Sequence, residues 1–356
     1  MNDDLTLLVE SQEVSGWNSI RVTRGIERCP SDFDIEMTER YAGEISTLVV
    51  KPGDACQVKL GNDVVITGYI DKVTPSISEN QHTIRVAGRG MCQDLVDCSA
   101  EWPGGQISSQ TVLTTAIMLA APYNITVNAT CEVGAVIAQT NIQFGESPYE
   151  IIERLCRWRA LLVYDQPDGS LLLSDVGTTM AASGFTEGIN IEKAALEYSI
   201  DGRFSEYWTS SQSADVLGDI GDAGYLHAVS KDPLVPRHRR HFFHCEASAS
   251  GLNLLQRRAD WEAKRRLGRS AKLSITTDSW RDSSGALYTP NTLVPLNISS
   301  LRIVNKAWLI SEISYKRNQD GTTCDLVIMP DQAFSIGPMT EAQAIGGSLA
   351  AEFQTK

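Results

Sequence analysis

The stretch QVKLGNDVVITGYI, residues 57–70, decides the fold of the first part of the chain. Residues 57–60 and 64–70 have the composition of β-strands, and Gly61, Asn62 and Asp63 between them are typical of a hairpin turn. The stretch therefore predicts two antiparallel strands.

Further strand patterns flank this hairpin. Residues 5–9 are apolar except for Thr6. Residues 19–24 and 33–38 alternate polar with apolar side chains, the period of a half-buried strand. Residues 82–88 complete a set of six or so short strands. Such a set is enough for a small closed barrel, which leaves few exposed edges. We therefore expect a first β-barrel at residues 1–99.

Residues 100–189 have a different character. Ser109 is a candidate N-cap for a helix through Leu119. A second helix is predicted after Ser147, where Pro148 occupies the first helical position and Glu150 follows early. Residues 161–173 contain two apolar runs around a Pro-Asp-Gly turn, which predicts a hairpin. The region is expected to be an α+β domain.

The strand pattern returns after residue 190. Residues 190–212 and 271–333 are predicted to form a second β-barrel, although no internal sequence repeat relates it to the first. Residues 213–270 interrupt it as a basic insertion with a helix at about 251–268, and residues 334–356 are expected to be a flexible tail. The predicted class is mainly β with α+β insertions, comprising two barrels, an α+β domain and a helix-containing insertion.

Composition excludes several functional classes. The 356 residues carry a net charge of −13 with an isoelectric point near 4.9, which argues against a nucleic-acid binder whose whole surface is basic. The chain has no long apolar run, and its acidic start is unlike a signal peptide, so we expect it to stay in the cytoplasm of the producing cell.

The possible metal ligands have unfavourable spacing. His238, His241 and His244 recur every three residues, so a strand or a helix does not place all three on one face. Cys92 and Cys98 match no common metal or redox motif. We therefore predict no metal site.

Catalytic and cofactor motifs are also absent from the sequence. Gly88-Arg89-Gly90 lacks the third glycine of a dinucleotide site, and Glu150 and Glu153 are expected to lie on a solvated helix face. No nucleophile motif occurs. The sequence predicts no catalytic residue, no cofactor and no enzymatic activity.

One segment has the opposite charge to the rest of the chain. Residues 237–272 contain ten Lys or Arg against three Asp or Glu, a local balance of +7. Such a face can bind an acidic protein, attract nucleic acid or pair with the acidic surface of another copy. The candidate interface residues are Arg237, Arg239, Arg240, Arg257, Arg258, Arg265 and Arg266.

Several short motifs, in order over residues 20–330, resemble the P-type baseplate hub family of Mu-like contractile phages. They are Gly16-Trp17, Val22-Thr23-Arg24 with Ile26-Glu27, Gly68-Tyr69-Ile70-Asp71, Val86-Ala87-Gly88-Arg89 with Asp94-Leu95-Val96-Asp97-Cys98, Arg203-Phe204-Ser205-Glu206-Tyr207, the Arg-rich helix at about 251–268, Trp280 and Pro290-Asn291.

This resemblance implies a structural protein of the virion tail, related to the hub of T4-like tails and to the base of type VI secretion spikes. It implies a homotrimeric ring of six similar barrels between a sixfold tail tube and a threefold central spike. The implied partners are other copies, the spike, the tube or a distal tail protein, and other baseplate proteins. A tailocin or type VI spike base, or a tail-associated peptidoglycan hydrolase, are the alternatives.

Overall fold

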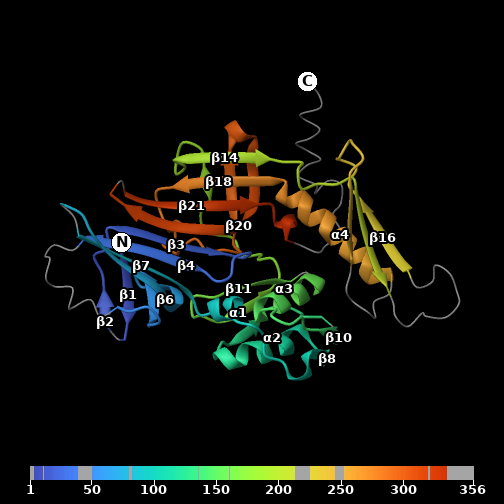
Figure 1. Ribbon diagram of the computed structural model, residues 1–356. Helices are drawn as coiled ribbons and strands as arrows, with labels where there is room; N and C mark the ends of the chain where they lie inside the picture. The colour runs from blue at the N-terminus through green and yellow to red at the C-terminus, as the bar shows by residue number, and fades with distance from the viewer. Residues whose placement is uncertain are drawn as a thin grey trace.

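The hairpin predicted at residues 57–70 is present in the computed structural model of the chain (Figure 1). Strand β5 (Ala55–Leu60) pairs antiparallel with the first half of β6 (Asp63–Ile77), and Gly61 in the turn adopts a φ of 62°. The structure describes residues 4–10, 12–38, 50–79, 82–134, 136–159, 161–212, 225–244, 252–319 and 321–334. The predicted tail therefore lies outside the described residues, apart from Phe334.

The first β unit is an antiparallel sheet that begins near the N-terminus. Its other strands are β1 (Leu5–Val9), β2 (Gln12–Val14), β3 (Ser19–Gly25), β4 (Asp32–Thr38) and β7 (His82–Gly90). They pair in the order β3-β4-β7-β6-β5-β1-β2. Leu5, Leu7 and Val9 are buried, as their alternation predicts, because every second side chain of a strand points to the same face.

An α+β unit follows at the lower part of Figure 1. Its elements are α1 (Gln93–Asp97), η2 (Pro103–Gly105), β8 (Gln106–Gln110), α2 (Val112–Ala120), η3 (Ala121–Tyr123), β9 (Val127–Ala129), β10 (Ile137–Asn141), α3 (Pro148–Arg159), β11 (Leu162–Asp165) and β12 (Leu171–Ser174). Strands β11 and β12 form the predicted hairpin, and β9 lies parallel to β12.

The two predicted helix starts have different outcomes. Before α3, Ser147 Oγ accepts a hydrogen bond from Glu150 N at 3.2 Å, and Glu150 Oε2 accepts one from Ser147 N at 2.8 Å, so this cap is confirmed. The Ser109 cap is wrong. Strand β8 continues to Gln110, and Thr111 caps α2 by accepting from Thr114 N at 3.1 Å.

The second β unit repeats the topology of the first. Its strands are β13 (Phe185–Thr186), β14 (Lys193–Tyr198), β18 (Ala271–Thr277), β19 (Leu293–Ile298), β20 (Ile303–Asn318) and β21 (Gly321–Met329). The antiparallel order β14-β18-β21-β20-β19 matches β3-β4-β7-β6-β5 strand for strand, in the same chain order. The bulge at Asp71 of β6 has a counterpart at Ser311 of β20. The two units therefore share one backbone design.

The two β units are joined into one sheet. The first part of the long strand β20 pairs with β19, and the part after its bulge pairs with β3, from Glu312 opposite Gly25 to Arg317 opposite Ile20. The mainly β class is confirmed. However, neither predicted barrel closes on itself within the described residues, because the second half of β20 pairs with the edge of the other unit.

A third unit lies within the second β unit, at the right of Figure 1. It comprises β15 (Glu206–Gln212), β16 (Tyr225–Lys231), β17 (Arg240–His244) and helix α4 (Leu252–Arg269), which confirms the predicted helix. The assignment of residues 190–212 to one barrel is wrong in its second half, because β15 pairs with β16 and β17. The buried ion pair of Arg203 with Asp232, at 2.8 Å, lies where the chain enters this unit.

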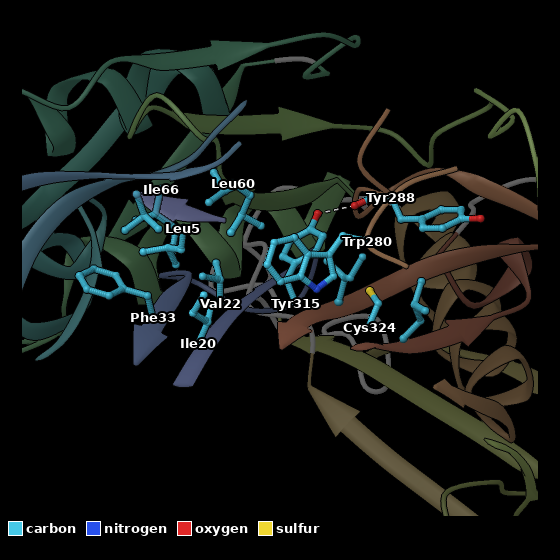
Figure 2. Packing of buried hydrophobic residues seen from close by; sticks show 14 of the residues in the cluster. Leu5, Ile20, Val22, Phe33, Leu60, Ile66, Trp280, Tyr288, Tyr315 and Cys324 are labelled. Carbon is cyan, nitrogen blue, oxygen red and sulfur yellow. Dashed lines mark hydrogen bonds between the residues drawn. The ribbon is translucent and has the colours of Figure 1, made fainter. Parts of the chain in front are cut away.

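One hydrophobic core runs through both β units. In Figure 2, Leu5, Val22 and Phe33 of the first unit lie in the same cluster as Trp280 and Tyr315 of the second. Trp280 Nε1 donates to the carbonyls of Lys316 and Thr323 at 3.1 and 2.9 Å, so its polar atom is satisfied on burial. Each large buried side chain contributes about 1.5–3 kcal/mol of apolar burial.

Candidate assembly interface

The motif residues around Arg89 form a structural cluster. Arg89 Nε donates to Asp71 at 2.7 Å, and its Nη2 donates to Asp97 at 2.7 Å. The hydrogen bond from Arg89 holds the pKa of Asp97 below its usual value. The guanidinium thus ties α1 to the bulge of β6, so this part of the family pattern positions the α+β unit against the first sheet.

The two glycines of this motif allow close backbone approach. A Cβ added at Gly88 would lie 2.3 Å from Tyr69 O, and one added at Gly90 would lie 2.5 Å from Asp165 Oδ2. Asp165 is buried and accepts hydrogen bonds from Ser31 N at 3.0 Å and Ser31 Oγ at 2.9 Å. Burial raises the pKa of Asp165. The Gly88-Arg89-Gly90 sequence therefore serves packing, within the first sheet at Gly88 and against the α+β unit at Arg89 and Gly90.

Four of the seven predicted interface arginines lie on α4, and three of them, Arg258, Arg265 and Arg266, form ion pairs within the chain. Arg258 and Arg266 pair with Glu262 at 3.5 and 2.6 Å. Burial alone would raise the pKa of Glu262, but the hydrogen bond from Arg266 and the nearby positive charges bring it below its usual value. Arg265 pairs with Glu27 of the first β unit at 3.2 Å, and Arg269 donates to the same carboxylate. These side chains hold α4 in place.

A cavity of about 380 Å³ lies where α4 meets α3 and the end of β3. Its lining includes Glu27, Arg157, Trp261, Arg265 and Arg269. Arg157 pairs with Glu153 at 2.8 Å, so both carboxylates of the lining have arginine partners. The charges at this junction are therefore engaged within the chain.

Two more of the seven arginines are held at the start of β17. Arg239 donates to the carbonyls of Ile200 and Asp201, both at 2.9 Å. Arg240 pairs with Glu206 at 3.0 Å and lies 4.4 Å from the centre of the Trp208 ring. Both contacts stabilise the third unit, and Arg240 also remains exposed.

Only Arg237 and Arg257 of the seven are exposed without an ion pair to another residue that the structure describes. The sequence therefore located a basic region correctly, but most of its charge is used in folding. These two positions are the ones at which the predicted interface stays testable without disturbing internal contacts.

The three histidines have unequal surroundings. His241 points toward α4, stacks on Phe204 with 4.8 Å between ring centres and lies 3.4 Å from Arg266 Nη2. Burial and the charge of Arg266 lower its pKa. His238 is exposed before the strand, and the side chain of His244 lies outside the described residues. The predicted separation of the three histidines therefore stays a prediction.

Sequence reasoning missed two strand edges. Strand β14 pairs with β18 on one side, and no described strand lies on its other side. Beyond Asp71, β6 pairs with β7, and no strand in the described ranges covers its second edge. Ile77 at the end of β6 is 78% exposed and Tyr198 at the end of β14 is 43% exposed. Residues 71–77 do not alternate polar with apolar side chains, so no strand pattern marked the edge of β6.

Comparisons with known proteins agree with this architecture. Three family models match in chain order: the N-terminal domain of Mu phage baseplate assembly protein GpP-like (residues 4–90), the second domain of baseplate hub protein gp44-like (residues 92–175) and the fourth domain of Mu phage baseplate assembly protein GpP (residues 252–337). Baseplate hub protein gp44 of Escherichia phage Mu is 29% identical in an alignment of 345 residues that covers 94% of this chain and 90% of that protein.

Solved structures extend the likeness to the whole fold. The 43 kDa tail protein of prophage MuSo2 from Shewanella oneidensis superposes with a TM-score of 0.84 at 29% identity, covering 93% of this chain and all of that one. An E. coli type VI secretion component shares the fold, with a TM-score of 0.59 at 12% identity over 91% of this chain and 76% of that one.

The protein is thus a structural component of a phage tail baseplate. The chain belongs to the Mu-type baseplate hub family. No helix in the described part of the chain is long and apolar enough to cross a membrane.

Proposed function

We propose that three copies form the ring of a contractile tail hub in the virion, between a sixfold tail tube and a threefold central spike, and that the chain catalyses no reaction. Assembly in the cytoplasm of the host bacterium, with the spike, the tube or distal tail protein and other baseplate proteins as partners, belongs to the same proposal. The proposed units are those predicted from the sequence, with β15 moved to the basic insertion.

The observation that carries the proposal is the repeated topology. Strand β20 of the second unit covers the edge of β3, the first strand of the first unit. The counterparts of these strands are β6 and β14, and the corresponding edges of both have no partner strand in the described ranges. Pairing β6 of one copy with β14 of the next copy would reproduce between copies the joint that β20 and β3 form within the chain. Closure after three copies would give six β units.

The repeat also predicts the register of this joint. Superposing the two bulges makes Lys72 equivalent to Glu312. The strand pairings from β6 through β7 and β4 to β3, and from β20 through β21 and β18 to β14, then make Thr23 equivalent to Glu197. Within the chain, Thr23 lies opposite Ser314, and their hydroxyls are 2.9 Å apart. The equivalent pair between copies is Thr74 opposite Glu197. The same register brings Val73 opposite Tyr198 and Ile77 opposite Ala194, which would cover exposed apolar surface.

Disulfide cross-linking tests this register. We expect the double variant Thr74→Cys and Glu197→Cys to form cross-linked dimers and trimers on mild oxidation, because directly opposite strand residues can be bridged. Thr23→Cys with Ser314→Cys is the positive control within one chain. Thr74→Cys with Lys193→Cys is the matched negative control, because Lys193 lies four residues before Glu197 on β14. Equal cross-linking in both interchain variants would refute the register.

Light scattering tests the ring itself. The expected mass is three times 39.0 kDa at the concentrations at which tails assemble. A monomer under those conditions would contradict the trimer.

The alternative of a tailocin or type VI spike base is supported by the shared fold alone. Tail particles discriminate against the type VI spike base, since a phage or tailocin hub purifies in free tail particles with tube and spike proteins. Digestion of purified cell wall by the chain would contradict the absence of catalysis.

A further inference from the structure

The strands from β14 to β6 form one continuous antiparallel run with two unlike ends, in the order β14-β18-β21-β20-β3-β4-β7-β6. Their pairings place the links β6–β7 and β20–β21 at one end, the turn end. At the opposite end, the insertion end, the chain enters the α+β unit after β7 and the third unit after β14. In Figure 1, α4 lies beyond the right-hand ends of β14 and β18. Both inserted units therefore leave the run at the same end.

At the turn end the two β units match. The last pairs that both hairpins share before their links are Ile77 with His82 in β6–β7 and Arg317 with Thr322 in β20–β21. The two links between these pairs are therefore equally long. All of their residues are polar or glycine, and each link contains one carboxylate. One chain thus presents two links of the same length and similar chemistry at this end.

At the insertion end the two β units differ. Strands β3 and β4 are linked by residues 26–31, whereas the equivalent strands β14 and β18 are linked by residues 199–270, which contain the third unit. After β7 the chain continues into the α+β unit, whereas after β21 the described residues form η6 (Asp331–Ala333). The repeat of the two β units is therefore broken at this end alone.

Closure of the proposed ring turns this contrast into a difference in symmetry. Pairing β6 of one copy with β14 of the next continues the run with all turn ends on the same side, because it reproduces the pairing of β20 with β3. Three copies then present six similar links at the turn end. At the insertion end they present three α+β units and three third units. The turn end approximates sixfold symmetry, and the insertion end has threefold symmetry.

We propose that the turn end of the ring binds the sixfold tail tube, with residues 78–81 and 318–321 contacting the same surface of successive tube subunits. The inference rests on the proposed hub function and adds which end of the ring meets which partner. Six identical tube subunits make identical contacts when the ring offers each of them the same surface. Of the two ends, the turn end offers six such surfaces. The insertion end then faces the threefold spike.

The charge of the links favours the tube over a second hub ring. The turn end of another ring has matching symmetry, but it would place six carboxylates against six carboxylates, since each link contains Glu79 or Asp320. Like charges brought together across an interface oppose association. A different protein with the same symmetry avoids this repulsion.

Photo-cross-linking in assembled tails tests the proposal. p-Benzoylphenylalanine replaces Glu79 in one full-length variant and Gln319 in another, because these exposed residues occupy equivalent positions in the two links. Ile117, which is 45% exposed on α2 of the α+β unit, carries the same probe as a matched control. We expect positions 79 and 319 to give adducts with the same peptide of one tube or distal tail protein, identified by mass spectrometry. Position 117 should give no adduct with that protein.

Several outcomes would overturn the proposal. These are adducts of position 79 or 319 with the spike, adducts only with other hub copies, adducts of the two positions with different peptides, or no adduct at either position. The cross-link between positions 74 and 197 is measured on the same tails. If it still forms, failure at positions 79 and 319 concerns the turn end alone and leaves the proposed ring standing.

Discussion

Gly88 and Gly90 show how residues without a side chain allow close packing. The lack of a Cβ at Gly88 lets β7 approach Tyr69 O and the ring of Phe33. Gly90, two residues on, gives the same space to the buried carboxylate of Asp165, which reaches across from the α+β unit to Ser31. Close packing between the first β unit and the α+β unit thus requires a residue without a Cβ at position 90.

Gly88→Ala should lower the free energy of unfolding by about 1–3 kcal/mol, because the new methyl group overlaps backbone that cannot easily move. Gly202→Ala is the matched control, since no atom lies within 4 Å of its added Cβ, and its effect should stay within about 0.5 kcal/mol. Urea denaturation of both variants checks the difference. Equal stabilities would show that β7 can shift to accept a side chain.

Helix α4 is the element for which the structure changes the sequence-based interpretation most. Its arginines were candidates for partner contacts, yet Arg265 and Arg266 pair with Glu27 and Glu262 of the same chain. Charge reversal at a half-buried, paired arginine removes the ion pair. The new carboxylate then faces the carboxylate of the former partner. Charge reversal at Arg265 and Arg266 is therefore expected to affect folding as well as any assembly contact.

The double change Arg265→Glu and Arg266→Glu should destabilise the chain by several kcal/mol, about 3–5 kcal/mol if each pair behaves as buried. The matched reversal Arg237→Glu and Arg257→Glu should leave unfolding within about 1 kcal/mol of the parent, because both side chains are exposed. Thermal unfolding gives the first comparison. Incorporation into the tail is compared by the amount of each variant retained in purified tails. An unchanged amount for Arg237→Glu with Arg257→Glu would remove these two positions from the interface.

Across the whole molecule, the repeated β units explain why two edges remain open. Inside the chain, the second half of β20 is covered by β3 and its side chains are largely buried, whereas the equivalent half of β6 is exposed. Open strand edges promote association, and natural proteins usually protect them. Here the proposed neighbour supplies the protection.

Ile77→Asp should leave the monomer folded and weaken association between copies at least about tenfold, since a buried carboxylate would oppose the apolar joint. Ile189→Asp is the control, because Ile189 is 80% exposed and lies outside both edges. Sedimentation over a concentration series measures the two association constants. The joint would be misplaced if the two variants associate equally well.

Local chemistry in the sequence was sufficient for several elements. The hairpin at residues 57–70, the cap formed by Ser147 and Glu150, and the helix near residue 255 each depend on neighbours within a few positions. The family motifs were also readable, because they are short and keep their order.

Partner choice between distant strands required the tertiary structure. Strands β14 and β15 both alternate, but only pairing shows that one joins β18 and the other joins β16. The repeat was invisible in the sequence because equivalent positions such as Pro75 and Tyr315 share a backbone place without sharing chemistry. By itself the sequence determined the local elements, the family and the acidic chain with one basic segment. Only the tertiary structure decided which edges and arginines stay free, because ladders and ion pairs form between residues far apart in the chain.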